Sequence, residues 1–532
     1  MGAVGTTQQN RPVLLQSLVS TSREISSTRS RTAKTALLAE ALRAAEPDEV
    51  PTVVSYLSGE LRQRRIGVGW RSLQELPPAA EAPTLSVAEA HEAFERMGLL
   101  SGSGSQAARA TELTQLFERA TSEEQEYLAL LVMGELRQGA LDGVMLAAVA
   151  EAAGVPGDAV RRAVMLRGAT GPVAAAALAE GVAGLDRFRL EVGQPLRPML
   201  ASTAADVPAA MAKAAEGAED APVAVEWKVD GIRVQVHREG DDVRVFTRSL
   251  DDITARVPEI VEAVVSLPAT SVVLDGEAVA LDEAGRARPF QATGSRTASS
   301  ANVTDLRARV PLTTYFFDVL HLDGDDLLDL PGADRQARLA GLLPADQQIP
   351  RLATADVAEA RRFFAEAVEA GHEGVVVKRL GETYEAGRRG SGWVKVKPRH
   401  TLDLVVLAAE WGHGRRRGWL SNLHLGARDE ESGELVMLGK TFKGLTDAML
   451  TWQTERLLEL ESHRDEHVVY ARPGLLVEIA FDGVQTSPRY PAGMALRFAR
   501  VLRHRTDKTA EEADTVQTVR AIHTGARPPT DV

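Results

Sequence analysis

The chain has 532 residues, which is too long for one hydrophobic core and suggests about three domains. Its 44% hydrophobic and 25% charged residues are those of an ordinary globular protein, and no apolar run approaches the ~20 residues that span a bilayer. The absence of cysteine excludes disulfides and cysteine-ligated zinc, while the net charge of −13 leaves local basic surfaces open.

Residues 1 to 200 have the pattern of helices. Ala and Leu recur at the spacing of about 3.6 residues typical of helices, and convincing strand patterns are lacking. The spacing predicts helices over residues 35–61, 87–97, 107–119, 122–137 and 141–153. Residues 193–198 (Gly-Gln-Pro-Leu-Arg-Pro) are predicted to be a linker.

Residues 226–233 (Glu-Trp-Lys-Val-Asp-Gly-Ile-Arg) form the most informative segment. Lys228 lies at the end of a strand-like alternation, close to Asp230 and Arg233. Such a lysine can act as a covalent nucleophile when burial or nearby cations disfavour its ammonium form, because only the neutral amine attacks. The alternative is a surface hairpin in which Asp230-Gly231 is a turn and both cations are solvated.

Further strand patterns follow along the chain. Arg248 follows a turn, and taken alone it suits an exposed strand. Glu277 follows Asp275-Gly276, where the glycine permits a close backbone approach unless the pair is a hairpin turn. Phe317 lies in an apolar strand, for which a core position and a stacking position against a ligand stay open.

The three valines at 375–377 predict a buried strand. Glu373 and Lys378 flank it, and charges at the ends of a buried strand are costly unless they bind something. Lys395 and Lys397 share one face of the next strand by the period of two, which suits an anion. The alternative is an edge strand whose lysines discourage aggregation.

A last short motif, Arg505-Thr506-Asp507-Lys508, lies near the C-terminus. Six motifs in this order between residues 226 and 508 resemble the series of the covalent nucleotidyltransferases, and specifically the ATP-dependent DNA ligases. The likeness extends to residues 135–143, 289–291, 384–389 and 402–406.

The resemblance implies a multidomain chain of the bacterial three-domain type. We expect an all-α N-terminal DNA-binding domain (1–200), an α+β adenylation domain of antiparallel sheets (205–399) and an all-β OB-fold domain (400–532). The nucleotide pocket is expected to lie wholly after residue 205. Beyond about Thr515 we expect a loose tail. NAD-dependent bacterial ligases carry a four-cysteine zinc module, which the missing cysteines exclude.

The resemblance also implies the chemistry. Lys228 would take AMP from ATP and pass it to the 5′-phosphate of a nick, which the 3′-hydroxyl then attacks. Glu373, with Glu277, would hold Mg²⁺, for which Mn²⁺ could substitute. The remaining residues would bind the nucleotide: Glu226 the adenine edge, Phe317 the ring face, Arg233 and Glu277 the ribose, Arg248 the ribose or a phosphate, Lys378, Lys395 and Lys397 the α-phosphate, and Arg505 and Lys508 the pyrophosphate.

Arg505 and Lys508 follow Lys397 by more than 100 residues and belong to another predicted domain. They can reach the nucleotide only if that domain closes on it, and they must then leave to admit DNA. We therefore expect a rotation between two domain arrangements.

Nicked duplex DNA is the partner that the resemblance implies, bound through its backbone without sequence readout. Residues 379–417 carry nine Lys or Arg against four Asp or Glu, a local charge of +5 that suits a DNA groove or, alternatively, a solvated face. We expect a monomer that makes no membrane contact. It is expected to be cytoplasmic and nucleoid-associated and to act in DNA repair, replication or recombination. No motif for a protein partner stands out. A capping guanylyltransferase or RNA ligase, and a catalytically dead DNA-binding scaffold, are the alternatives.

Overall fold

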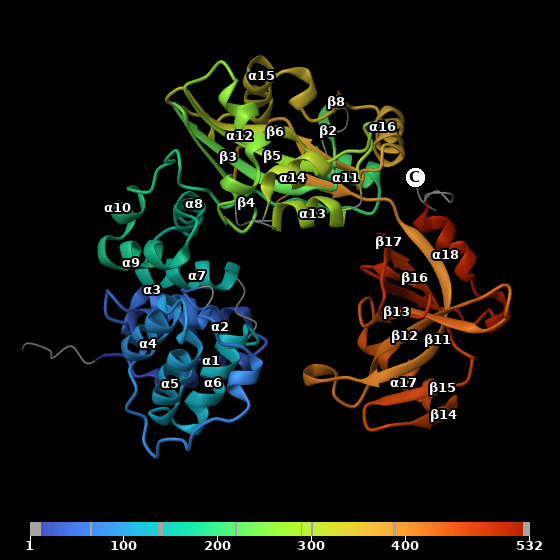
Figure 1. The fold of residues 1–532 in the computed structure, drawn as a ribbon, viewed down its shortest axis with the longest axis horizontal. Helices are drawn as coiled ribbons and strands as arrows, with labels where there is room; N and C mark the ends of the chain where they lie inside the picture. Colours follow the sequence, from blue (N-terminus) through green and yellow to red (C-terminus); the bar gives the residue numbers. More distant parts are fainter. Residues whose placement is uncertain are drawn as a thin grey trace, which may run out of the picture.

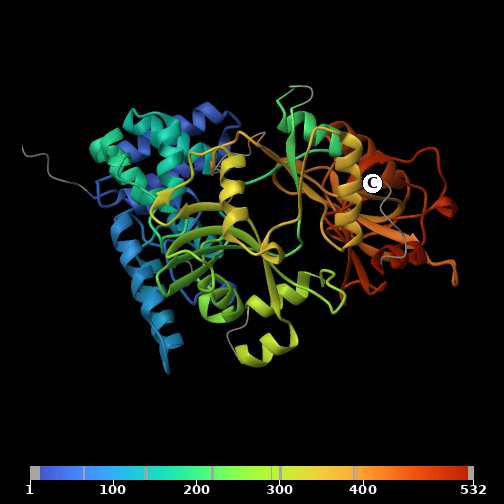
Figure 2. The same ribbon diagram turned by 90° about the horizontal axis from the view of Figure 1, so that it is seen from above.

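The computed structural model describes residues 12–63, 66–136, 138, 142–216, 218, 221–288, 290–298, 302–386, 390 and 392–524. Its three parts form an arch, with the N-terminal helices and the C-terminal strands on opposite sides of a central pair of sheets (Figure 1). The view from above again places the central part between the other two (Figure 2). Parts of the segments used in the sequence predictions lie outside the described ranges, namely residues 137, 139–141, 289 and 387–389.

Helices make up the N-terminal part of the described chain. They are α1 Leu15–Ser27, α2 Arg31–Ala44, α3 Val50–Leu57, α4 Val87–Leu99, α5 Ser105–Glu118, α6 Ser122–Met133, α7 Asp142–Ala153, α8 Gly157–Arg167, α9 Thr170–Glu180 and α10 Val182–Leu185, with a 3₁₀ turn at Trp70–Leu73. The helix predicted over 35–61 is wrong, because Pro47 disfavours helix in the residue before it and separates α2 from α3. Helix α6 is shorter than predicted, because Gly134 closes it with a φ of 65°.

One hydrophobic core joins these helices. Leu38 of α2, Val53 of α3, Phe94 of α4 and Val149 of α7 all belong to it. Among the described residues, no single helix is long and apolar enough to cross a membrane. The pair α7 and α8 meets the length and composition criteria only when it is joined across a bend of 120°.

Two five-stranded sheets form the central part, in the orders β1-β10-β9-β2-β8 and β4-β3-β5-β6-β7. The pairings within them are antiparallel except for β1 with β10, so the predicted antiparallel α+β fold is confirmed apart from that pair. The strands are β1 Ser202–Thr203, β2 Val223–Trp227, β3 Ile232–Glu239, β4 Asp242–Thr247, β5 Ser271–Ala280, β6 Leu312–Leu322, β7 Asp325–Asp326, β8 Arg351–Thr354, β9 Val375–Arg379 and β10 Trp393–Val396.

Helices pack on both central sheets. Helices α11 and α16 share a core with β2, β9 and β10, and helices α12 and α15 share a core with β3, β5 and β6. The helices of this part are α11 Val207–Ala214, α12 Pro258–Val265, α13 Phe290–Ala298, α14 Val303–Arg309, α15 Gly332–Leu342 and α16 Val357–Glu369.

Residues 228–231 cross from one central sheet to the other, because β2 and β3 pair in different sheets. The hairpin alternative is therefore wrong, since its two strands would have to pair with each other. A Cβ at Gly231 would lie 2.2 Å from the carbonyl oxygen of Ala278, so the crossing requires glycine. Gly276 lies within β5 rather than in a turn, and a Cβ there would lie 2.7 Å from the Phe316 ring, which confirms the predicted close approach.

The C-terminal part is rich in strands around one core. Its main sheet runs β13-β12-β11-β15-β14, with β16 pairing to β11 and β19. The strands are β11 His400–Trp411, β12 Leu420–Arg428, β13 Leu435–Thr441, β14 Glu461–Arg464, β15 Val468–Ala471, β16 Leu476–Phe481, β17 Gly483–Thr486, β18 Met494–Arg497 and β19 Arg500–His504. Two helices, α17 Asp447–Glu459 and α18 Val516–His523, correct the all-β prediction. Helix α18 corrects the loose-tail prediction for residues 516–523, and Thr515 caps it by accepting from the Thr518 amide. The rest of the predicted tail, residues 525–532, lies outside the described residues.

A buried ion pair fixes α15 to β6. Arg335 and Asp318 have side chains that are 2% and 4% exposed, and two nitrogens of the guanidinium donate to the two carboxylate oxygens at 2.8 and 3.0 Å. Arg335 also donates to the carbonyl oxygens of Leu330 and Glu382. One side chain thereby satisfies groups from three segments of the central part.

Arg335→Met should lower the thermal unfolding temperature, because it leaves Asp318 as an unpaired buried carboxylate, a loss of about 3–5 kcal/mol. The double variant Asp318→Leu/Arg335→Met should lose less, since no charge remains to be buried. Scanning calorimetry compares both with Arg338→Met, which removes an exposed arginine from the same helix. A single variant as stable as Arg338→Met would contradict the assignment.

Candidate active site

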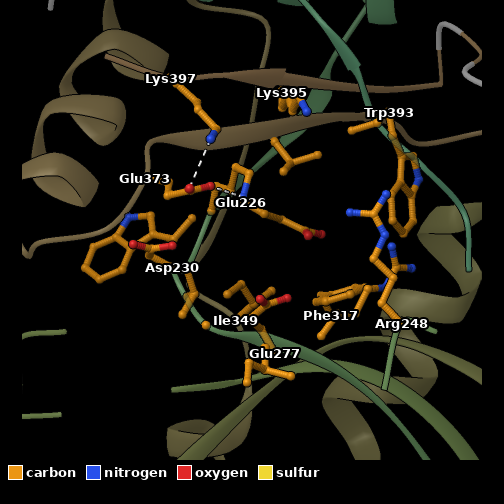
Figure 3. A pocket seen from close by; sticks show the side chains of 18 of the residues that line it. Glu226, Asp230, Arg248, Glu277, Phe317, Ile349, Glu373, Trp393, Lys395 and Lys397 are labelled. Atoms are coloured by element: carbon orange, nitrogen blue, oxygen red, sulfur yellow. Dashed lines mark hydrogen bonds and ion pairs between the residues drawn. The ribbon is translucent and has the colours of Figure 1, made fainter. Parts of the chain in front are cut away.

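A cavity of about 500 Å³ collects most of the predicted site residues (Figure 3). Its walls come from both central sheets and from Arg497 and Phe498 of the C-terminal part. Leu200 and Ala201 also line it, so the expectation that the pocket lies wholly after residue 205 is wrong. The predicted residues that it brings together are Glu226, Lys228, Arg233, Arg248, Glu277, Phe317, Glu373, Lys378, Lys395 and Lys397.

Backbone hydrogen bonds place Lys228 beside Glu373. The Lys228 amide donates to the carbonyl oxygen of Gly374, and the Glu373 amide donates to the carbonyl oxygen of Lys228, both at 2.8 Å. Gly374 has a φ of 123°, and a Cβ there would lie 2.3 Å from the carbonyl oxygen of Val396. Only glycine lets the segment before β9 approach β10 this closely.

The Glu373 carboxylate holds two lysines. Its Oε2 pairs with Lys228, and its Oε1 lies 3.0 Å from Lys397 Nζ (Figure 3). Lys397 Nζ in turn lies 3.3 Å from Asp482 in the C-terminal part. Burial favours the neutral acid, but the two ammonium groups outweigh it and lower the pKa of Glu373 to about 2. Glu373 thus brings Lys228 and Lys397 together at one end of the cavity.

Glu277 and Asp230 line the cavity as well. Burial raises the pKa of Glu277 to about 7, although Lys228 opposes the shift. Burial, followed by the charge of Glu373, raises the pKa of Asp230, against the effect of Arg497 at 3.6 Å. The nearby cations therefore offset only part of the cost of burying these two carboxylates in their charged form. Among the described residues, no group of three or more His, Asp or Glu is arranged to hold a metal ion without further ligands.

Arg233 is held by a network behind the cavity. Its Nε and Nη2 donate to the two oxygens of Asp275 at 2.9 and 2.5 Å, and its Nη1 donates to the carbonyl oxygen of Met199. The Tyr384 hydroxyl donates to Asp275 at 2.7 Å and accepts from the Met199 amide at 3.1 Å. This network ties Met199, which follows the predicted linker, to β3 and β5, and the ribose contact of Arg233 stays a prediction.

A second glutamate bracketed by cations lies next to Phe317. Glu226 Oε1 accepts from Arg351 Nε and Nη2 at 2.9 and 2.6 Å, and its Oε2 lies 2.6 Å from Lys378 Nζ. Lys378 Nζ is 4.6 Å from the ring centroid of Phe317 and 3.9 Å from that of Trp393. Burial lowers the pKa of Lys378, and Glu226 opposes that shift. Lys378 thus lies against the two rings, and its α-phosphate contact stays a prediction.

Two of these residues were missed from the sequence. Arg351 lies in no recognised motif, and only its pairing partner Glu226 reveals its position. Trp393 opens the strand that carries Lys395 and Lys397, but nothing in the local pattern separates a cavity-lining ring from a core ring. Phe316 is fully buried in the core whereas Phe317 lines the cavity, so stacking on a ligand stays a prediction for Phe317.

Arg505 and Lys508 lie outside the cavity in this arrangement. Arg505 Nη1 and Lys508 Nζ are both 2.7 Å from Asp403 Oδ2, and Arg505 also pairs with Asp507. Phe498 lines the cavity instead, with a φ of 57° and a largely exposed ring. Contact of Arg505 and Lys508 with pyrophosphate would require a different placement of the C-terminal part, so the domain rotation stays a prediction.

Comparisons with known proteins cover the chain from the N-terminal helices to the C-terminal strands. Residues 72–150 match the DNA ligase N terminus, 198–397 the ATP dependent DNA ligase domain and 416–508 the ATP dependent DNA ligase C terminal region. Two relatives, each named "Probable DNA ligase", come from Nocardioides sp. (strain ATCC BAA-499 / JS614) and Beutenbergia cavernae. Each is 60% identical, over 518 and 515 residues, which is 96% of this chain and 99% of the relative.

A solved structure named Pmar-Lig_Pre. supports the fold. It has a TM-score of 0.57 and 18% sequence identity, and the match covers 92% of this chain and 99% of that one. The relatives and the three matched regions together give the identity of the protein. The chain belongs to the ATP-dependent DNA ligase family, and it is an ATP-binding ligase of the nucleotidyltransferase type.

Proposed function

We propose that this ligase seals 5′-phosphate/3′-hydroxyl nicks in duplex DNA through a covalent Lys228–AMP intermediate. The observation that carries the proposal is one cavity with two ends. Lys228 and Lys397 meet on Glu373 at one end, and Phe317 and Trp393 lie beside Lys378 at the other. Lysines suit phosphate oxygens and aromatic faces suit a purine, so the cavity matches both parts of ATP.

Three phosphoryl transfers make up the reaction. The neutral Lys228 amine attacks the α-phosphorus of ATP, a P–N bond forms, and the bond to pyrophosphate breaks. A 5′-phosphate oxygen of the nick then displaces the lysine and takes the AMP. The 3′-hydroxyl finally attacks the activated 5′-phosphorus and releases AMP, so that a phosphodiester forms without a poor leaving group at any step.

Glu373 is the carboxylate partner of Lys228 in this scheme. Its pKa of about 2 keeps it ionised, and its ion pair holds the Lys228 side chain in the cavity. Glu373 and Glu277 are the residues that would hold Mg²⁺ or Mn²⁺, and the raised pKa of Glu277 fits a carboxylate that lacks a cation. A bound divalent cation would neutralise charge on the nonbridging phosphate oxygens. Glu373 would then be shared between that cation and Lys228, which it contacts in this structure.

The remaining site residues position the nucleotide. Lys395 and Lys397 hold the α-phosphate in every step, Glu226 accepts from the adenine edge, and Phe317 stacks on the ring. Glu277 and Arg233 bind the ribose, and Arg248 binds the ribose or a phosphate. Lys378 binds the nucleotide from its place beside Phe317. Arg505 and Lys508 contact the pyrophosphate after the C-terminal domain has rotated toward the cavity.

The two flanking parts engage the DNA. The N-terminal helices, up to about residue 200, form an all-α domain that grips the duplex backbone, and the C-terminal part from about residue 400 is an OB-fold with two added helices. The enzyme works as a monomer in the bacterial cytoplasm, in DNA repair, replication or recombination. The match of residues 72–150 to the DNA ligase N terminus favours DNA ligation over mRNA capping or RNA ligation.

Lys228→Ala should abolish the covalent adduct, because no other group takes the AMP. Incubation with labelled ATP and Mg²⁺, followed by denaturation and mass spectrometry, measures the added AMP. Binding to nicked DNA should persist, and Lys213→Ala, which removes an exposed lysine from α11, should label normally. Label retained on the Lys228→Ala protein would refute the assignment.

Removal of residues 1–190 should weaken nick binding strongly while AMP labelling stays near normal, since Met199, Leu200 and Ala201 are kept. Removal of residues 1–201 should impair labelling as well, because Arg233 and Tyr384 lose their partner and the cavity loses a wall. Nick binding by the full chain should also fall steeply with salt as counterions are released. Equal labelling by the two shortened chains would show that residues 191–201 are dispensable for AMP transfer.

Arg505→Ala/Lys508→Ala should cripple Lys228–AMP formation and leave sealing of a pre-adenylated nick near the wild-type rate. Pyrophosphate is present only in the first transfer, and an interaction made in one transition state affects that step alone. Arg503→Ala, at an exposed site on β19, is the matched control, and Lys395→Ala should slow all steps. A double variant equally defective on pre-adenylated nicks would reveal a second role at the DNA end.

A further inference from the structure

Arg351 connects two residues at the purine end of the cavity. It stands opposite Glu226 in the pairing of β8 with β2, and β8 is the edge strand of its sheet. Its guanidinium donates twice to Glu226 Oε1, at 2.9 and 2.6 Å, and its Nη2 also donates to the carbonyl oxygen of Phe317 at 3.3 Å. Glu226 and Phe317 line the cavity, whereas Arg351 lies behind them.

The hydrogen bonds of Glu226 leave Oε2 open as an acceptor. A carboxylate offers about four lone-pair sites. Arg351 fills the two on Oε1, whereas Lys378 is only an ion-pair partner of Oε2, because its Nζ makes no hydrogen bond. Glu226 is only 3% exposed, so water does not readily supply a partner for Oε2. A ligand in the cavity therefore meets a carboxylate that is ready to accept one more hydrogen bond.

Arg351 also determines where that open site points. A planar guanidinium fixes the orientation of a carboxylate, whereas an ammonium on a flexible stem acts as a point charge. With Lys378 as its only partner, Glu226 would turn toward the ammonium between Phe317 and Trp393. The open acceptor would then no longer have a defined direction.

We propose that Arg351 is a positioning residue for base selection, and that it aims the free acceptor of Glu226 at position 6 of the purine. An amine at that position donates to the carboxylate, and a keto oxygen is repelled by it. The inference rests on the proposed function, because it takes the cavity to bind a purine nucleoside triphosphate. It assigns adenine selection to a residue that does not itself touch the base.

The test compares ATP with inosine triphosphate, which carries a 6-keto group in place of the amine. Rates of AMP and IMP transfer to the protein are measured across nucleotide concentration for wild type, Arg351→Met, Arg351→Lys and Arg361→Met. Arg351→Met should raise KM for ATP about tenfold, lower the preference in kcat/KM for ATP over inosine triphosphate about tenfold, and change kcat by no more than about twofold. Arg351→Lys should recover part of the preference, and Arg361→Met, at an exposed site on α16, should match wild type.

A purely structural role predicts a different pattern. Equal losses with both nucleotides, together with a lower thermal unfolding temperature, would overturn the proposal, as would an unchanged preference. If Arg351→Met does not fold, Arg351→Lys decides, because a lysine that leaves the preference at the wild-type value also refutes aiming by the guanidinium. Calorimetric binding of both nucleotides to the same proteins separates the two hypotheses. A wild-type protein that binds ATP selectively but forms no adduct refutes the covalent mechanism and leaves base selection standing.

Discussion

The ion pairs of Glu373 with Lys228 and Lys397 are the interaction on which the rest of the site depends. These residues come from three places: the crossing between the sheets, the segment before β9 and the end of β10. Without the carboxylate, two ammonium groups would repel each other in a partly buried space. Asp482 also pairs with Lys397, so a residue of the C-terminal part joins this group of charges.

Each end of the cavity holds a glutamate between two cations. Glu373 lies between Lys228 and Lys397 at one end, and Glu226 lies between Lys378 and Arg351 at the other. Under the proposed mechanism, the ion pair of Glu373 has to open before Lys228 attacks phosphorus. Under the proposed base selection, Glu226 has to keep a fixed direction. A flexible lysine suits the first requirement, and the planar guanidinium of Arg351 suits the second.

Sequence reasoning succeeded where the determining pattern was local. The period of two placed Lys395 and Lys397 together, and the motif order anticipated which side chains would line one cavity. It failed where distant strands decide the outcome. The role of Arg351 becomes visible only through the pairing of β8 with β2. Residues 199–201 became part of the site because Met199 is hydrogen-bonded to Arg233 and Tyr384. The errors in helix bounds have local causes, Pro47 and Gly134. The prediction followed the helical periodicity and passed over these two residues.

Asp403 holds Arg505 and Lys508 together as one unit. The carboxylate is buried, so removing both cations would leave it charged and poorly solvated. Asp403 lies on β11, in the same C-terminal part as both cations, so a rotation of that part would carry all three residues together. The two cations are therefore oriented side by side before they meet any ligand, and less side-chain entropy remains to be lost when an anion with several oxygens contacts both.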